Sequence, residues 1–247
     1  MFRSWGAFIV FAADQGFGEH IMCSRYNLTS PPEAVRAYFS VPASEAFLPR
    51  YNIAPTQPAL IVWPGARGSR ELVLVRWGLI PSWVREPGKF ATLVNARAET
   101  LVEKPSFRGA LRHKRCLVPA DGYYEWTGAT GAKQPHLIRA REGGPLAFAG
   151  LYEQWMGADG SEVDTMAIIT VPANDAVRGV HDRMPAILMR EQFETWLDCK
   201  SVDAREASGL LAPCANDRLE VVPVSRRLNS PRNEGPELLV PEAPGLI

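Results

Sequence analysis

Six short runs of β-branched and aromatic residues, bounded by Gly and Pro, constrain the fold of this 247-residue chain most strongly. They cover residues 59–63, 71–77, 136–140, 146–149, 165–171 and 220–224. Runs of this length and composition are typical of strands, and the Gly128–Gly131 stretch predicts the tip of a hairpin. Because strands that follow one another through short turns pair antiparallel, we expect an α+β fold with a single, antiparallel, β-rich domain.

Helical signals are few and short. Ser30-Pro31-Pro32-Glu33 has the composition of a capping box, with Ser30 as N-cap, and predicts a helix that ends near Phe39. Apolar residues at i, i+3 and i+4 predict a second helix at 193–197, and residues 204–211 predict a third.

The composition excludes several classes of protein. Lys and Arg number 27 and Asp and Glu number 27, so the formal net charge is zero. This balance argues against coating of nucleic acid by bulk charge, although a locally basic cleft remains compatible with it. The four cysteines show no CxxC spacing, which predicts a reducing, cytoplasmic location. No stretch is long and apolar enough to span a bilayer, and the motifs of metal sites and nucleotide cofactors are missing, so we expect no cofactor.

Cys23 directly follows Met22, and this pair points to unusual chemistry. A cysteine that becomes the first residue of a chain carries a free α-amine beside its thiol, with pKa values of about 8 and about 8.5. The amine condenses with an aldehyde to an imine, and the thiol then closes a five-membered thiazolidine. An internal cysteine cannot do this, because its nitrogen belongs to an amide.

Residues 1–21 precede this pair and have three interpretations. The favoured one is a start codon placed too far upstream, with Met22 as the true start and its removal exposing Cys23. The second is a propeptide. The third, a secretory signal, is disfavoured, because the apolar core at 6–13 is short and no small-x-small cleavage site precedes Cys23. We therefore expect a leader at 1–21, a catalytic domain at 22–235 and a tail at 236–247.

Six strings along the chain are dense in Asn, Arg, Glu, His and Trp. They are Met22-Cys23-Ser24-Arg25-Tyr26, Arg50-Tyr51-Asn52-Ile53-Ala54-Pro55, Trp77-Gly78-Leu79-Ile80-Pro81-Ser82-Trp83, Asn95-Ala96-Arg97-Ala98-Glu99-Thr100, Asp121-Gly122-Tyr123-Tyr124-Glu125-Trp126 and His181-Asp182-Arg183-Met184-Pro185. In this order they closely resemble the SRAP family, the SOS response-associated peptidases or abasic site processing proteins. The resemblance covers nearly the whole chain from Met22. It implies an open β-barrel or sheet core flanked by a few short helices.

The resemblance also implies a function in the repair of DNA damage. Proteins of this family bind abasic sites in single-stranded DNA and form a thiazolidine with the ring-opened sugar, which shields the lesion. It implies a monomer without membrane contact that acts at the nucleoid, in contact with the replication machinery. Carried over to this chain, Cys23 is the nucleophile.

The same resemblance assigns roles to further residues. It makes Asn95, Glu125 and His181 the supporting polar residues, and Arg97 and Arg183 the phosphate contacts. Candidates for contacts with the bases are Trp77 and Pro55, and candidates for outer contacts are Arg25, Arg108 and Arg112.

The chemistry of these residue types agrees with such roles. An abasic sugar is mostly a closed hemiacetal, so opening it requires proton transfer. Glu125 lies among aromatic residues, where desolvation is expected to raise its pKa and keep it able to donate a proton. His181 titrates near neutral pH and suits the opening of the sugar or the reversal of the adduct. Asn95 can hold the substrate or the amine without a change of charge.

Each role has a structural alternative. Glu125 could be a solvated strand carboxylate and His181 an ordinary loop histidine, while Arg97 and Arg183 could pair with Glu99 and Asp182. Trp77 could belong to the core. Two other functions use the same residues: a thiol peptidase that acts through Cys23, on its own leader or on other chains, and a non-catalytic DNA-binding module.

Overall fold

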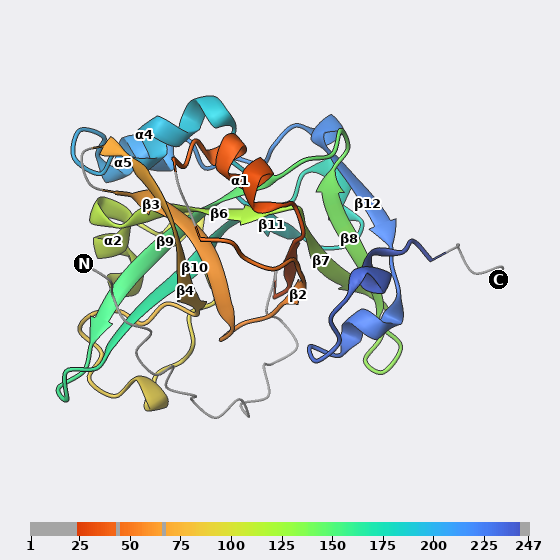
Figure 1. Cartoon of the computed structure of the whole chain (residues 1–247), viewed down its shortest axis with the longest axis horizontal. Helices are drawn as coiled ribbons and strands as arrows, with labels where there is room; N and C mark the ends of the chain where they lie inside the picture. Colours follow the sequence, from red (N-terminus) through yellow and green to blue (C-terminus); the bar gives the residue numbers. More distant parts are fainter. Residues whose placement is uncertain (1–23, 43–44, 66–67, 243–247) are drawn as a thin grey trace.

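The computed structural model describes residues 24–42, 45–65 and 68–242 (Figure 1), so Cys23 and the expected leader lie outside the described residues. The strands in this part are β1 (Tyr26–Leu28), β2 (Arg50–Ile53), β3 (Pro58–Pro64), β4 (Arg70–Trp77), β5 (Asn95–Arg97), β6 (Arg115–Ala120), β7 (Gly122–Thr127), β8 (Gln134–Ala140), β9 (Leu146–Met156), β10 (Glu162–Pro172), β11 (Arg183–Pro185) and β12 (Leu219–Pro223). The α-helices are α1 (Pro32–Phe39), α2 (Pro105–His113), α3 (Asp175–Arg178), α4 (Phe193–Leu197) and α5 (Ala204–Ser208). Short 3-10 turns are η2 (Pro87–Lys89), η3 (Ala98–Thr100), η4 (Arg190–Gln192), η5 (Asn216–Arg218), η6 (Arg226–Asn229) and η7 (Pro236–Leu239).

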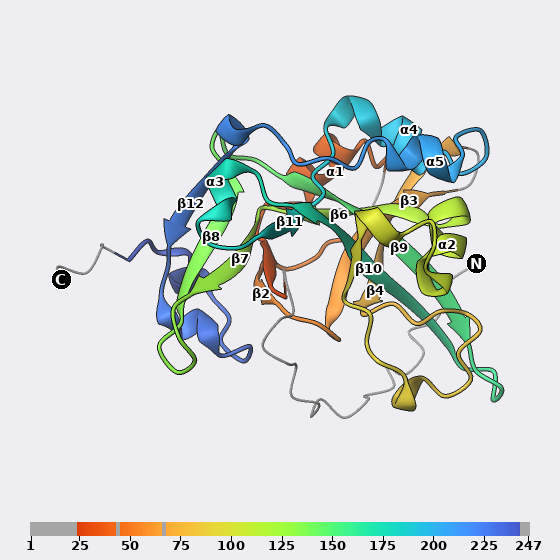
Figure 2. The same cartoon turned by 180° about the vertical axis from the view of Figure 1, so that it is seen from behind.

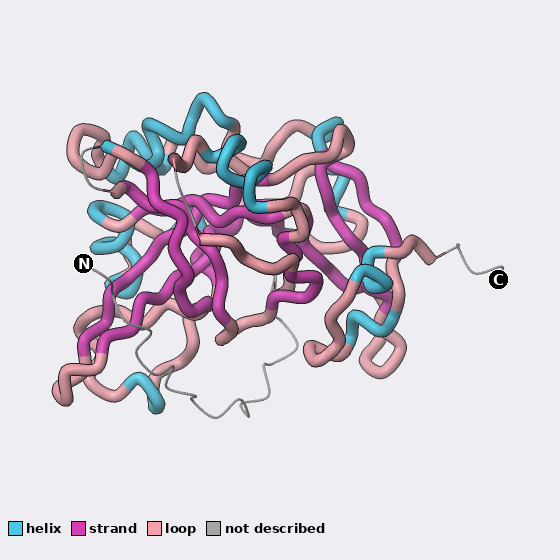
Figure 3. Tube along the Cα trace, viewed as in Figure 1, coloured by secondary structure: helices cyan, strands magenta, loops and turns pink. Residues whose placement is uncertain are grey.

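The larger sheet closes on itself. Its strands follow the order β11-β10-β4-β3-β6-β9, and β9 also pairs with β10, so five of them form a barrel. Most neighbours are antiparallel, whereas β10 runs parallel to β4 and to β5. The barrel occupies the left half of Figure 1, and Figure 3 shows that strands form its body while helices lie around it. The expected β-rich α+β fold is confirmed, with a mixed barrel at its centre.

The smaller sheet has the order β12-β8-β7-β1-β2 and is antiparallel throughout. It lies to the right of the barrel in Figure 1. The chain passes from the barrel strand β6 to β7 of this sheet through one residue, Asp121. The hairpin expected around Gly128 joins β7 to β8, as the sequence predicts.

Aromatic side chains connect the two sheets in the core. Phe148 of β9 lies edge-on to Tyr26 of β1, with ring centroids 6.3 Å apart, and edge-on to Tyr123 of β7 at 5.9 Å. All three residues are buried. Edge-to-face pairs contribute about 0.5–1.5 kcal/mol beyond the burial of their area, so these contacts fix the smaller sheet against the barrel.

The three helices expected from the sequence are present, whereas α2 and α3 were not predicted. α1 ends at Phe39 and α4 covers 193–197 as expected, while α5 is shorter than the predicted 204–211. The capping box at Ser30 is wrong, because Pro31 is the N-cap and makes no side-chain cap. The Ser30 hydroxyl instead donates to Asp121 Oδ1 at 2.6 Å. A carboxylate brought close by the tertiary fold therefore binds the hydroxyl that the sequence assigned to the cap.

The C-terminal segment packs against the smaller sheet. Leu238 of η7 is fully buried with Tyr124 and Leu137, and Pro241 forms a bridge with Val224. Packing thus continues past the expected domain boundary at 235. None of the helices in the described ranges is long and apolar enough to cross a membrane.

Replacing Asp121 tests the turn where the chain changes sheets. Its carboxylate accepts the backbone N–H groups of Thr29 (2.5 Å) and Ser30 (2.6 Å) and both their hydroxyls. We expect Asp121→Ala to lower the free energy of unfolding by about 2–3 kcal/mol in urea titrations, because these donors lose a charged acceptor. The exposed Asp217 is the matched control, and Asp217→Ala should change stability by less than about 0.5 kcal/mol. Equal effects of the two substitutions would contradict this account.

Candidate functional site

The start of the described chain lies beside Glu125. Strands β1 and β7 are antiparallel with Tyr26 opposite Tyr123, and the Tyr124 N–H donates to the Arg25 carbonyl at 3.0 Å. Continued by one more residue, this register sets Ser24 opposite Glu125. The Glu125 residue is only 4% exposed. The alternative of a solvated strand carboxylate is therefore wrong.

Glu125 is on the barrel side of its sheet. Side chains alternate between the two faces of a strand, so Glu125 shares a face with Tyr123. Tyr123 packs on Phe148 of the barrel, with ring centroids 5.9 Å apart. The carboxylate thus faces the layer between the smaller sheet and the barrel, and Glu125 is not without an interaction partner.

A second group of predicted residues surrounds the end of β10. Thr170 of β10 pairs with Arg97 of β5 on one edge and with Pro185 of β11 on the other. Asn95 and Arg97 share one face of β5, opposite to the fully buried Ala96. Asn95 is partly buried and also has an interaction partner, whereas Arg97 is exposed.

Arg183 and Glu99 form an ion pair across this strand. Arg183 Nη1 lies 2.5 Å from Glu99 Oε1, and Nη2 lies 2.9 Å from Oε2. Nη2 also donates to the Thr170 carbonyl at 2.7 Å. The pair therefore ties η3, which follows β5, to the first residue of β11 over β10. The sequence alternative placed Arg183 beside Asp182, whereas its partner in the structure is Glu99, so a DNA phosphate would have to compete with the Glu99 carboxylate.

His181 is held through one of its ring nitrogens. The Arg183 N–H donates to His181 Nδ1 at 3.0 Å, and Asp182 Oδ1 lies 2.9 Å from the same nitrogen. One nitrogen cannot accept and donate at once, so the contact with the Arg183 N–H requires Nδ1 without a proton and the contact with Asp182 requires Nδ1–H. Both orient the ring from Nδ1 and leave Nε2 for chemistry.

Trp77 connects the two groups from inside the core. Its ring lies edge-on to Tyr26 with centroids 5.2 Å apart, and its Nε1 donates to the Val94 carbonyl at 3.0 Å, beside Asn95. Its backbone exchanges hydrogen bonds with Thr56 (2.7 Å) and Gln57 (3.0 Å). Trp77 has 0% exposure, which corrects the expectation that it contacts a base. Its physical role is to fix the strands that carry the site residues.

Pro55 lies in a strained turn. Gln57 N–H donates to the Ala54 carbonyl at 3.2 Å, and Thr56 between them has φ +69°, unusual for a β-branched residue. Backbone strain of this kind persists where the surroundings enforce it and is concentrated at functional sites. Pro55 itself is buried, so the structure does not support its predicted role as an exposed base contact.

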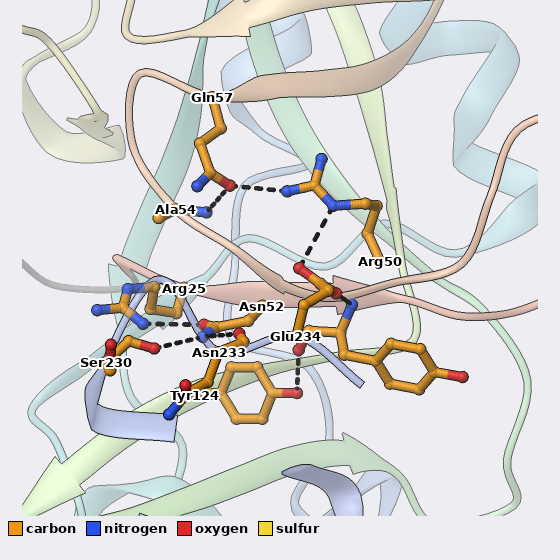
Figure 4. A network of polar contacts seen from close by, with 10 residues as sticks. Arg25, Arg50, Asn52, Ala54, Gln57, Tyr124, Ser230, Asn233 and Glu234 are labelled. Atoms are coloured by element: carbon orange, nitrogen blue, oxygen red, sulfur yellow. Dashed lines mark hydrogen bonds and ion pairs between the residues drawn. The ribbon is translucent and has the colours of Figure 1, made fainter. Parts of the chain in front are cut away.

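A polar network, shown in Figure 4, anchors β1 and β2 to the C-terminal segment. Arg25 Nη1 donates to Asn52 Oδ1 at 2.8 Å and to the Leu228 carbonyl at 3.1 Å. Asn52 Nδ2 donates to the carbonyls of Ser230 (3.0 Å) and Asn233 (2.9 Å). Burial lowers the pKa of Arg25 to about 10, which leaves it charged at neutral pH.

This network changes the expected role of Arg25. The guanidinium also lies 5.7 Å from the centre of the Trp126 ring, so its charge is taken up inside the protein. Arg25 is therefore an anchor for the segment next to Ser24 and not an outer DNA contact. Asn52 was missed as an anchor by sequence reasoning, although it lies within a quoted string.

The arrangement offers a buried carboxyl group on β7, the strand paired with β1, and an amide and an imidazole around the end of β10. Among the described residues, no group of three or more His, Cys, Asp and Glu side chains is placed to hold a metal ion. The chemistry available comes from a buried carboxyl group, an amide and an imidazole.

Substitution of Trp77 tests its connecting role. We expect Trp77→Phe to lower the free energy of unfolding by about 2–3 kcal/mol, because ring volume is lost and the Val94 carbonyl loses its donor. Trp83 is 57% exposed and provides the control, for which Trp83→Phe should cost less than about 0.5 kcal/mol. Chemical denaturation of both variants measures the difference. A Trp77→Phe variant as stable as Trp83→Phe would exclude this role.

The Glu99–Arg183 pair makes a pH-dependent contribution to stability. Its hydrogen bond from Arg183 lowers the pKa of Glu99. Since the pKa is lower in the folded chain, the contribution is complete above the unfolded pKa of about 4.3 and is lost as the pH falls below it. The carboxylate is partly exposed, so we expect Glu99→Gln to cost only about 0.5–1 kcal/mol at pH 7. Denaturation at pH 7 and at pH 3 should show that the stability cost of Glu99→Gln is smaller at pH 3. The control substitution Glu103→Gln should have no stability cost at either pH.

Comparisons with known proteins identify the family of the chain. The family model described as SOS response associated peptidase (SRAP) matches residues 22–231. The abasic site processing protein YoqW of Bacillus subtilis is 40% identical over 223 residues, covering 88% of this chain and 99% of that protein.

The chain is also similar to a vertebrate protein and to a solved bacterial structure. The abasic site processing protein HMCES of Gallus gallus is 38% identical over 227 residues, covering 79% of this chain and 67% of that protein. A crystal structure of a protein from Bacteroides thetaiotaomicron superposes with a TM-score of 0.80 at 28% identity, covering 90% of this chain and all of that one. The chain belongs to the SRAP family, whose curated relatives are named abasic site processing proteins.

Proposed function

We propose that this protein captures abasic sites in single-stranded DNA by forming a thiazolidine between Cys23, as its first residue, and the ring-opened sugar. Membership of the SRAP family supports action on abasic sites. The family match begins at Met22, the residue that directly precedes Cys23.

The observation that carries the proposal is the register of β1 against β7. It sets Ser24 opposite the buried Glu125. Cys23 is bonded to Ser24, and consecutive α-carbons are about 3.8 Å apart. The proposal therefore assigns the Glu125 carboxyl group to the reaction of a residue bonded to Ser24. Its position between the two sheets suits proton transfer away from bulk water.

The reaction balances without oxidation or reduction. The α-amine attacks the sugar aldehyde at C1, and the carbinolamine loses water to give an imine. The thiol then adds to the same carbon while its proton moves to nitrogen. One C–N and one C–S bond form, and the aldehyde oxygen leaves as water.

The other site residues have roles that follow from their positions. Glu125 acts as the acid that expels water, and His181 transfers the proton that opens the closed sugar. Asn95 holds the sugar or the amine by hydrogen bonds. The exposed Arg97, on the same face of β5 as Asn95, contacts a neighbouring phosphate.

Arg183 has a less direct role in this proposal. Its pairing with Glu99 fixes the loop of His181 relative to β5, and so relative to Asn95. It becomes a phosphate contact only when DNA displaces Glu99. Contacts of this kind with DNA phosphates do not depend on the base sequence, and they weaken as the salt concentration rises.

Intact mass spectrometry tests the proposal directly. We expect the protein expressed from its native gene to begin at Cys23. After incubation with an abasic single-stranded oligonucleotide, its mass should increase by that of the DNA minus one water. Cys23→Ala should form no adduct, whereas Cys199→Ala, which removes another partly exposed cysteine, should react like the wild type.

Other outcomes separate the competing functions. An adduct in Cys23→Ala, or no adduct with a mature Cys23 terminus, would overturn the proposal. If the wild type loses residues 1–21 and Cys23→Ala retains them, Cys23 acts as a thiol peptidase on its own leader. Salt-dependent DNA binding without an adduct would leave only a DNA-binding module.

A further inference from the structure

The chain after β12 folds back over the face of the smaller sheet that points away from the barrel. Figure 2 shows this segment, in dark blue, at the end of the molecule that carries β7, β8 and β12. We call residues 228–234 the C-terminal clamp, because polar contacts join them to Arg25, β2 and β7. We propose that this clamp positions Cys23 for its reaction and that it acts through Asn52. The inference rests on the proposed function.

Asn52 lies at the centre of the contacts of the clamp (Figure 4). It has 0% exposure, and its Nδ2 donates to the carbonyls of Ser230 at 3.0 Å and Asn233 at 2.9 Å. Its Oδ1 accepts from Arg25 Nη1 at 2.8 Å. The opposite orientation of the amide would turn its oxygen toward two carbonyls and its NH2 group toward the guanidinium, so only one orientation satisfies the network. Asn52 therefore links the clamp to Arg25 in one fixed geometry.

The clamp holds the Arg25 side chain at more than one point. The Leu228 carbonyl accepts from Nη1 at 3.1 Å, in addition to the contact with Asn52. The guanidinium also lies 5.7 Å from the centre of the Trp126 ring. The Trp126 indole donates to Asn229 Oδ1 at 2.8 Å, so this ring is itself tied to the clamp. A long side chain that is held at several points loses most of its rotamer freedom, and this restrains the backbone to which it is attached.

The position of Arg25 bears directly on Cys23. Only Ser24 separates the two residues, so their α-carbons lie at most about 7 Å apart. Since β1 begins at Tyr26, Arg25 lies just before the strand, where the Tyr124 N–H donates to its carbonyl at 3.0 Å. A misplacement of about 1 Å in a reacting group can slow a reaction about a hundredfold. The contacts that hold Arg25 therefore also orient the amine and the thiol toward the sugar.

The clamp also fixes β2, the strand that carries Asn52. The Glu234 carboxylate accepts the Tyr51 N–H through Oε1, and its Oε2 lies 3.5 Å from Arg50 Nε. The Tyr51 carbonyl accepts the Tyr124 hydroxyl at 2.7 Å. Because β2 is an edge strand of the smaller sheet, these contacts restrain it where no further strand does. Glu234 is thus a second positioning residue, which acts on Asn52 through β2.

Apolar packing does not account for the contacts of the clamp. Leu228 and Leu238 are buried against the sheet, but none of residues 229–237 between them is buried. Hydrogen bonds hold this stretch, and segments of this kind open locally at a low cost in free energy. Its polar contacts converge on Arg25 and on the strand of Asn52, next to the proposed nucleophile. This distribution supports a role in positioning rather than in the core.

The variant Asn52→Asp tests the clamp without a change in side-chain size. It keeps an oxygen for Arg25 but replaces both N–H donors with an oxygen that faces the Ser230 and Asn233 carbonyls. With saturating abasic single-stranded oligonucleotide, we expect adduct formation about tenfold slower than in the wild type. The Kd for an undamaged oligonucleotide should not change, because Asn52 is buried. Asn216→Asp, which alters an exposed amide that also bonds another segment, is the matched control and should react like the wild type.

A surface variant keeps the proposal testable if thermal melting shows that Asn52→Asp fails to fold. Glu234 is exposed, so Glu234→Ala removes the acceptor of the Tyr51 N–H without opening a cavity in the core. We expect Glu234→Ala to slow adduct formation about threefold, whereas Glu191→Ala, which removes an exposed carboxylate elsewhere, should leave it unchanged. Because both clamp substitutions act on one path, Asn52→Asp/Glu234→Ala should react no more slowly than Asn52→Asp alone.

Three results would overturn this proposal. The first is a wild-type rate of adduct formation in Asn52→Asp and Glu234→Ala. The second is a loss of rate that is matched by an equal loss of affinity for undamaged DNA, which would assign the clamp to binding. The third is a double variant in which the two losses add, which would mean two independent effects. The absence of an adduct in the wild type is a separate result, which would overturn the proposed function itself and this inference with it.

Discussion

The buried Trp77 is the contact on which the geometry of the site depends. Its ring meets Tyr26 of β1, its indole N–H holds the Val94 carbonyl before β5, and its backbone holds the turn at Thr56. These three segments come from separate parts of the sequence, and no direct pairing between β1 and β5 exists in the sheets of the described chain. A single large side chain with one donor therefore sets the distance between them. Trp77 can set this distance because its side chain is fully buried.

The second constraint is the exact placement of the segment that follows Cys23. β1 is only three residues long, too short to be stable by its own hydrogen bonds. It is held by β2 and β7 at its edges, by Asp121 at one end and by Arg25 at the other. Arg25 reaches Asn52 and the C-terminal carbonyl of Leu228. The two ends of the described chain thus stabilise each other beside Glu125.

The local parts of this fold could be predicted from sequence, whereas the long-range parts could not. The hairpin of β7 and β8 and the end of α1 follow from turn residues and periodicity. Closure of the barrel by β9 and β10, and the parallel pairing of β10 with β4, depend on contacts between distant segments. Ser30 shows the same limit on a smaller scale. Its hydroxyl donates to Asp121, which is distant in the sequence, instead of capping α1 as predicted.

The site could be predicted in its residues but not in their roles. A motif string does not say which members face the core, so Trp77 was interpreted as a base contact although it is buried. Arg25 and Arg183 were interpreted as DNA contacts because arginine suits phosphates. Their partners, Asn52 and Glu99, lie in other segments or across a strand, and only the fold brings them within reach.

The fate of the arginines explains how a protein with zero net charge can present a basic surface. Arg115 is fully buried and donates to the carbonyls of Leu111, Trp196, Asp198 and Val202, so its charge is stabilised by dipoles without an acid. Arg25 is likewise held by an amide and a carbonyl. Net charge therefore says little about any one face, and a basic surface can exist beside a neutral total because charge is distributed unevenly between interior and surface.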